Sequence, residues 1–237
     1  MKSFNRFNTL LLCLSLGLVI GFSSCKKDKD EEKPFVTNAS KFSDPAYVPL
    51  SSSFSNSTNP DAQQALSYAQ MIKSQLQAYS SFFNIPADAS YSAGKVLGVW
   101  TWNYQGYTAE YMVEEVGSRY LFTYTWTYLG SPYYGFTGWE ETSGNAGHLE
   151  MNFVDANELY TIDWTNNSGN FVIDMKLADA GVVYSRYVGT YNANGSGNVK
   201  FYDDGDLYYE ALWNTDGSGT ATTYNSDGTV EDTYSWS

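Results

Sequence analysis

Apolar and polar residues alternate in steps of two from Val96 to the end of the chain. Within residues 120–128, aromatic side chains occupy every second position and threonines fill most of the positions between them. Residues 100–104 and 171–177 repeat this pattern. A period of two is typical of antiparallel strands that have one buried and one solvated face. This feature restricts the fold to a mainly β, antiparallel structure.

Short glycine-containing turns separate the alternating segments. Asn-Gly and Asp-Gly pairs are preferred in tight hairpins, because both turn positions there require a positive φ. No segment between them is long enough to serve as a helical crossover between parallel strands. We therefore expect a meander of about 11 or 12 short strands that is open, rolled or barrel-like. The expected turns are Gln105-Gly106, Gly117-Ser118, Asn194-Gly195, Asp204-Gly205, Asp216-Gly217 and Asp227-Gly228.

One internal repeat lies near the C-terminus. Gly195-Ser196-Gly197 recurs as Gly217-Ser218-Gly219, and Trp213 recurs as Trp236. The unit is a hairpin of about 22 residues, which indicates a meander that was extended by duplication.

Residues 60–84 have a helical period instead. Asn59 is a favourable N-cap, Pro60 suits the first helical position, and Asp61 favours the helix dipole there. Asn84 and Pro86 end the pattern. We expect one amphipathic helix whose apolar stripe packs on the β domain. The stripe consists of Ala62, Ala65, Leu66, Ala69, Ile72, Leu76, Tyr79 and Phe83.

The N-terminus has the features of an export signal. Lys2 and Arg6 precede the apolar run Leu10–Phe22, which is shorter than the ~20 residues needed to span a bilayer. Ser23-Ser24 and then Cys25 follow. This arrangement resembles the lipobox of bacterial lipoproteins, although Phe22 stands where that family usually has leucine. The resemblance implies cleavage before Cys25 and acylation of this cysteine, which would anchor the chain to a membrane.

The charged segment 26–33 (KKDKDEEK) resembles the surface-export signal of Bacteroidota lipoproteins. It implies an outer-membrane lipoprotein displayed on the cell surface, with a periplasm-facing anchor as the alternative. We expect a signal peptide at 1–24, the lipidated cysteine and a flexible tether at 25–59, and a helix-plus-β domain at 60–237. Because Cys13 lies in the leader, the mature domain would have no disulfide and no cysteine-based site.

Negative charge is concentrated in the β domain. Residues 96–237 contain four lysines and arginines against 19 aspartates and glutamates, and the whole chain has a net charge of -13. Nucleic acid would be repelled, because its binding depends on basic residues that neutralise phosphates. We expect no nucleic-acid partner and no cofactor.

No catalytic motif has a specific spacing. His148 is the single histidine, and we expect it at an exposed strand start. We predict no catalytic residue and no metal ligand. A carboxylate-dependent glycoside hydrolase stays an alternative, because that chemistry needs only two carboxylates. Acidic residues cluster in sequence at Glu140, Glu141, Glu150, Asp155 and Glu158.

Aromatic residues are unusually frequent, with 17 Tyr, 7 Trp and 5 Phe in residues 96–237. Most should fill the core, but rows of rings on neighbouring strands can also form a platform for sugar rings or extended peptides. We therefore predict a non-enzymatic binding module for glycans or for host or extracellular macromolecules. Its candidate ligand-binding residues are Trp100, Trp102, Tyr104, Tyr120, Tyr124 and Trp126.

Two further functions stay open. Gly98-Val99-Trp100 is similar to the opening of lipocalins, which implies a barrel enclosing a small apolar ligand. A structural or assembly role for the lipoprotein is the other alternative.

Overall fold

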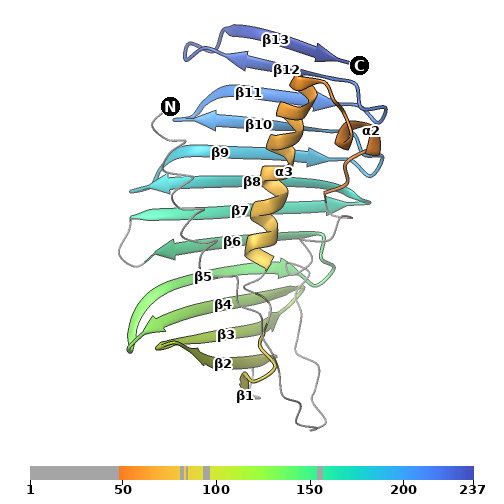
Figure 1. The fold of residues 1–237 in the computed structure, drawn as a ribbon. Coiled ribbons are helices and arrows are strands. Elements are labelled where there is room, and N and C mark those ends of the chain that lie inside the picture. Colours follow the sequence, from red (N-terminus) through yellow and green to blue (C-terminus); the bar gives the residue numbers. More distant parts are fainter. Residues whose placement is uncertain (1–47, 81–82, 84, 93–96, 154–156) are drawn as a thin grey trace.

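The fold is one open antiparallel sheet crossed on one face by a long helix (Figure 1). The computed structural model describes residues 48–80, 83, 85–92, 97–153 and 157–237. Its 13 strands follow one another in sequence order across the sheet, and each pairs only with its neighbours in the chain. The predicted mainly β antiparallel meander with an N-terminal helix is confirmed, and the sheet is open, because β1 and β13 lie at opposite edges.

The described segments comprise two helices and slightly more strands than the 11 or 12 we expected. No helix in these segments is long and apolar enough to cross a membrane. The elements are α2 (Ser52–Ser55), α3 (Pro60–Ser80), β1 (Ser90–Ser92), β2 (Gly98–Tyr104), β3 (Tyr107–Val116), β4 (Arg119–Tyr128), β5 (Ser131–Glu141), β6 (Ala146–Phe153), β7 (Glu158–Asn167), β8 (Asn170–Asp179), β9 (Val182–Tyr191), β10 (Gly197–Asp203), β11 (Asp206–Trp213), β12 (Gly219–Tyr224) and β13 (Val230–Trp236).

Helix α3 begins and packs as its sequence predicts. The Oδ1 atom of Asn59 accepts hydrogen bonds from the backbone N–H groups of Asp61 (2.9 Å) and Ala62 (3.3 Å), which caps the first turn. The helix ends at Ser80; Asn84 and the Tyr79 side chain lie outside the described residues. Buried members of the predicted stripe are Ala62, Ala65, Leu66, Ala69, Ile72, Leu76 and Phe83.

Alanines on this stripe allow the helix to lie close to the aromatic face of the sheet. The Tyr68 ring packs on Phe201 and Tyr209, with centroids 4.5 and 4.6 Å apart. The buried Tyr160 hydroxyl donates to Gln75 Oε1 at 3.0 Å. This pairing stabilises the contact, because a buried hydroxyl without a partner is costly. The helix is thereby fixed across the strands in the middle and C-terminal parts of the sheet (Figure 1).

The segment just before α3 belongs to the fold and not to a flexible tether. Phe54 of α2 is fully buried, and its ring stacks on Trp213 at 4.9 Å and lies 6.2 Å from Trp236. Burial of this ring gives the Ser- and Asn-rich segment enough apolar contact to dock. Our tether assignment is therefore wrong for residues 48–59, and residues 25–47 lie outside the described part of the chain.

The repeated hairpin contains a repeated contact between tryptophan and glycine. Trp213 Nε1 donates to the Gly195 carbonyl at 3.0 Å, and Trp236 Nε1 donates to the Gly217 carbonyl at 2.7 Å. Each tryptophan also pairs in register with a glycine on the neighbouring strand: Trp213 with Gly197 and Trp236 with Gly219. A Cβ atom added to Gly219 would lie 2.3 Å from both a Trp236 ring atom and the Leu212 carbonyl. Glycine is required because the ring occupies the space of a side chain.

Three turns share the sequence Asn-x-Asn/Asp-Gly-Ser/Thr, at residues 192–196, 214–218 and 225–229. In the second, Asp216 Oδ1 accepts from the Ser218 N–H (3.0 Å) and hydroxyl (2.7 Å). These hydrogen bonds lower the pKa of the Asp216 carboxyl. Asn194 Oδ1 accepts the same pair of bonds from Ser196 in the first turn. The turn therefore needs an acceptor oxygen at this position, which either a carboxylate or a side-chain amide can supply.

Substituting Gly219→Ala should destabilise the C-terminal hairpins by about 1–3 kcal/mol, because the added methyl overlaps the Trp236 ring. Urea unfolding followed by tryptophan fluorescence measures this. The matched control Thr220→Ala, at the exposed next position, should cost less than about 1 kcal/mol. Equal unfolding midpoints for the two variants would contradict the packing argument.

Asp216→Ala should lower the thermal unfolding midpoint at neutral pH, whereas Asp216→Asn should preserve it, because Asn194 performs the same role in the first turn. The carboxylate has a lowered pKa in the fold, so its contribution is lost as the pH falls through that pKa. Calorimetry between about pH 7 and 3 should therefore show the wild type losing stability relative to Asp216→Asn. A parallel decline of both proteins would disagree with this.

Candidate binding surface

The helix face of β2–β4 carries five of the six predicted aromatic residues, which are Trp100, Trp102, Tyr120, Tyr124 and Trp126. Register pairs Trp100 with Tyr111 of β3, which pairs in turn with Tyr124 of β4. Ala109 separates Trp102 from Trp126 in the neighbouring row. These rows continue the dry face on which α3 packs. The Tyr104 side chain lies outside the described residues.

Burial divides these rings into two groups. Trp100 and Tyr124 are core residues with exposed fractions of 5% and 2%. Phe83, which follows α3 in sequence, packs on Tyr111 with centroids 6.1 Å apart, and so covers the inner row. Trp102, Tyr120 and Trp126 are only partly buried. A ligand on this face would therefore meet the outer rings, while Trp100 and Tyr124 support them from below.

Three outer rings were absent from our candidate list. Tyr128 and Tyr133 have exposed fractions of 45% and 50%, on either side of the β4–β5 turn. The Tyr107 ring lies 4.7 Å from Tyr128, 5.5 Å from Trp126 and 5.6 Å from Tyr133. The alternation along residues 120–128 already places Tyr128 on the same face as Tyr124 and Trp126. For Tyr107 and Tyr133, the only feature in the sequence is that each lies near a glycine-containing turn. We call Trp102, Tyr107, Trp126, Tyr128 and Tyr133 the aromatic surface.

The core fixes the position of this surface. Trp126 Nε1 donates to the Tyr124 hydroxyl, and the Tyr124 ring stacks on Phe136 with centroids 4.7 Å apart and planes 3° from parallel. Burial raises the pKa of Tyr124, so the phenol stays neutral. The outer rings are thus pre-organised, which reduces the entropy lost when a ligand binds.

Charged residues are absent from the sequence around the aromatic surface. Residues 97–109 and 120–139, which supply all five of its rings, contain no aspartate, glutamate, lysine or arginine. The rest of the β domain is strongly acidic. Because this surface offers no charge of its own to pair with an ionic ligand, it suits a neutral one.

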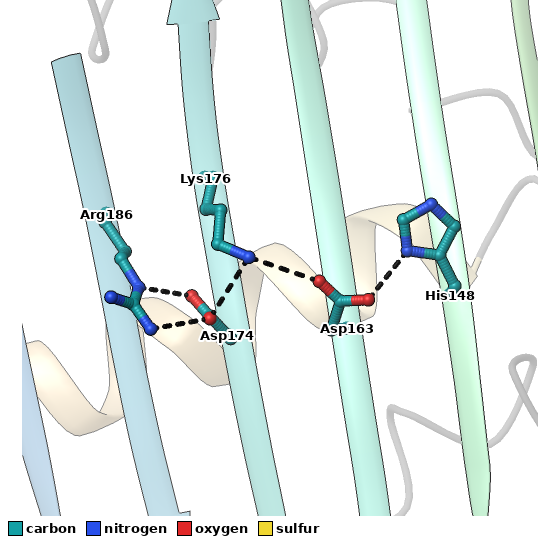
Figure 2. Close-up of polar contacts among 5 residues, drawn as sticks. All are labelled: His148, Asp163, Asp174, Lys176 and Arg186. Carbon is teal, nitrogen blue, oxygen red and sulfur yellow. Dashed lines mark hydrogen bonds and ion pairs between the residues drawn. The ribbon is translucent and has the colours of Figure 1, made fainter. Parts of the chain in front are cut away.

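The opposite face of the sheet carries a polar network (Figure 2). Asp163 points to this face, because its neighbours Ile162 and Trp164 are buried on the other. His148 Nδ1 lies 2.7 Å from Asp163 Oδ1, and Lys176 lies between Asp163 (3.4 Å) and Asp174 (3.2 Å). Arg186 binds Asp174 through two hydrogen bonds of 2.8 and 2.9 Å. The network links four consecutive strands, β6 to β9.

Basic residues concentrate on this open face. Arg119, Lys176, Arg186 and Lys200, the four basic residues of 96–237, all alternate with helix-face positions on their strands. Arg119 lies 3.9 Å above the Trp139 ring, and Lys200 pairs with Glu210 at 3.0 Å. Half-exposed ion pairs contribute at most about 1 kcal/mol each. This arrangement is typical of cross-strand ties that keep an uncovered sheet face hydrated.

His148 differs from our expectation of an exposed strand start. It is the third residue of β6, it is half-buried, and its ring stacks near Trp139 with centroids 6.5 Å apart. Its partner Asp163 is supplied by the adjacent strand β7, which sequence proximity did not reveal.

The clustered carboxylates that the structure describes are divided between the two faces of the sheet. Glu140 is fully buried on the helix face, whereas Glu141 and Glu150 point to the open face. Asp155 lies outside the described residues. Consecutive strand residues necessarily face opposite sides, so proximity in sequence does not bring these groups together. Among the described residues, no group of three His, Cys, Asp or Glu side chains is placed to hold a metal ion.

The lipocalin-like alternative loses its structural basis. Gly98 and Trp100 lie on β2, next to the edge strand β1, and this edge does not pair with β13. An open sheet encloses no barrel interior, so the three-residue similarity does not extend to the fold.

No protein-family model and no curated protein sequence matches this chain.

Raising the pH above about 10 should destabilise the fold, because burial raises the pKa of Tyr124, Tyr191 and Tyr209 above that of an exposed phenol. Unfolding releases these protons, so stability is lost as the pH rises through the ordinary tyrosine pKa. Urea midpoints at about pH 8 and pH 11, with absorbance at 295 nm, measure this. Tyr124→Phe should show a smaller fall between the two pH values, and an equal fall would contradict a neutral, buried Tyr124.

Proposed function

We propose that this chain is a membrane-anchored, surface-exposed lipoprotein that acts as a non-enzymatic, glycan-binding module. The observation that carries the proposal is the aromatic surface, where half-exposed rings are held in place by ring contacts and by the buried Tyr124. Tyrosine and tryptophan combine an apolar face with a polar edge. These faces suit the C–H faces of sugar rings, and the polar edges suit their hydroxyl groups.

The mode of anchoring supports outward presentation of this surface. Lipidation at Cys25 would attach the chain through residues 26–47, which lead to the start of the described fold at Val48. Ser51 N donates to the Gly195 carbonyl at 3.3 Å, so the chain joins the sheet at the β9–β10 turn. The β4–β5 turn lies at the opposite ends of the strands from the β9–β10 turn (Figure 1). A domain tethered near one set of strand ends would present the other set to the surroundings.

Charge supports the same ligand class. The β domain repels anionic polymers through its excess of acidic residues. The aromatic surface itself contains no ionic group, and a neutral glycan needs none. A protein ligand is the alternative that the test below separates from a glycan.

Screening the purified full chain in detergent against a glycan array should show saturable binding to neutral glycans. Tyr128→Ala and Tyr133→Ala should each weaken binding about tenfold, because a ring contact is worth about 1 kcal/mol or more. Tyr234→Ala is the matched control, since this tyrosine is 37% exposed on the distant strand β13. A blank array, or full binding by both variants, would leave crosslinking to protein partners as the next search.

A further inference from the structure

Leu129 occupies an unfavourable position at the tip of the β4–β5 hairpin. It is the first residue of the turn Leu129-Gly130, and its φ of 49° lies in the left-handed region. Its side chain is 78% exposed, more than any other large apolar side chain in the described part of the chain. A left-handed conformation is unfavourable for a non-glycine residue, because its Cβ atom lies too close to the following carbonyl oxygen. Leu129 recovers little of this cost through burial.

The fold does not require leucine at this position. Four other described turns place a non-glycine residue at φ 47–54° directly before a glycine. Polar or small residues fill these positions, as turn preferences predict. A leucine is disfavoured at this turn position, and an apolar side chain is disfavoured at such an exposed site. Residues that break local preferences in this way concentrate at functional positions. The equivalent residues are Gln105, Ser168, Ala180 and Asp204.

Leu129 adjoins the aromatic surface. Its backbone N–H donates to the Gly106 carbonyl at 3.2 Å, which ties the β4–β5 tip to the neighbouring β2–β3 tip. A Cβ atom added to Gly106 would lie 3.5 Å from the Tyr128 ring and 4.0 Å from Leu129 Cδ2. The exposed leucine is therefore next to Tyr128, at the outer end of the ring cluster.

We propose that the aromatic surface selects neutral sugars that carry a methyl group, either in an N-acetyl substituent or as a 6-deoxy carbon. The proposal rests on the glycan-binding function above. The pyranose ring stacks on the half-exposed tyrosines, and its methyl group contacts Leu129. An apolar side chain next to rings, in a sequence without charge, matches a ligand with an uncharged ring and one apolar substituent.

The test compares ligands that differ in that substituent alone. Chitohexaose and cellohexaose share one backbone and differ in the N-acetyl group. Glycosides of 6-deoxy-D-galactose and of D-galactose differ only at C6, which carries a methyl group in the first and a hydroxymethyl group in the second. Isothermal titration with the purified full chain should show about fourfold tighter binding to the methyl-bearing member of one pair, as expected for one buried methyl group. The pair that shows the preference identifies the source of the methyl group.

Leu129→Asn should remove this preference and raise the thermal unfolding midpoint, because asparagine tolerates the left-handed conformation. Ala180→Asn is the matched control: it changes the equivalent position of the β8–β9 turn, and should raise the midpoint without altering binding. If Leu129 is kept for ligand selectivity, Leu129→Asn should be more stable than the wild type and should lose the preference for the methyl-bearing sugar.

Distinct outcomes separate the two proposals. If the wild type binds no glycan at all, the proposed function fails and the selectivity proposal fails with it. If the wild type binds both members of each pair equally, or Leu129→Asn retains the preference, glycan binding stands and the role of Leu129 is overturned. If Leu129→Asn instead changes the sedimentation of the protein, the tip is a contact between two copies of this chain, and the selectivity proposal is overturned.

Discussion

Helix α3 packs on one face of the sheet, and the rest of the structure depends on this contact, because the described part of the chain forms no second sheet. A meander of 13 strands has two faces and two edges. The buried apolar side chains lie on the face that α3 covers. Alanines bring the helix close to the sheet, and large rings such as Phe201 fill the remaining space. Toward the C-terminus, Phe54 continues this cover over Trp213 and Trp236. Burial of aromatic rings, rather than closure into a barrel, stabilises the fold.

The candidate binding surface follows from the limited length of this cover. Aromatic rows of β2–β5 start in the core under Phe83 and continue beyond it to half-exposed rings at the β4–β5 turn. The inner rings therefore stabilise the sheet, and the outer ones are held rigidly by the same contacts. The strained and exposed Leu129 completes this end of the sheet. The core and the candidate binding surface thus share one continuous set of side chains.

The other face shows how an uncovered sheet stays hydrated. Its side chains form cross-strand ion pairs such as Arg186 with Asp174. All four basic residues of the acidic β domain lie on this face. Each pair contributes little stability, but charged pairs discourage stacking with other sheets. The two faces therefore differ in role: one supplies the core and the candidate binding surface, and the other keeps the sheet in solution.

Strands, turns and helix were readable from the sequence because each depends on local periodicity and turn chemistry. The Asn59 cap, the alanine stripe of α3 and the Asp-Gly turns lie where the pattern predicts them. Long-range contacts decided the rest. The sheet is open because β1 and β13 do not pair with each other. Trp100 is a core residue and Phe54 docks on Trp213 because segments that are distant in sequence meet in the fold. Alternation places a ring on a face, but only tertiary packing determines whether that face is covered, because the covering residue lies far away in sequence.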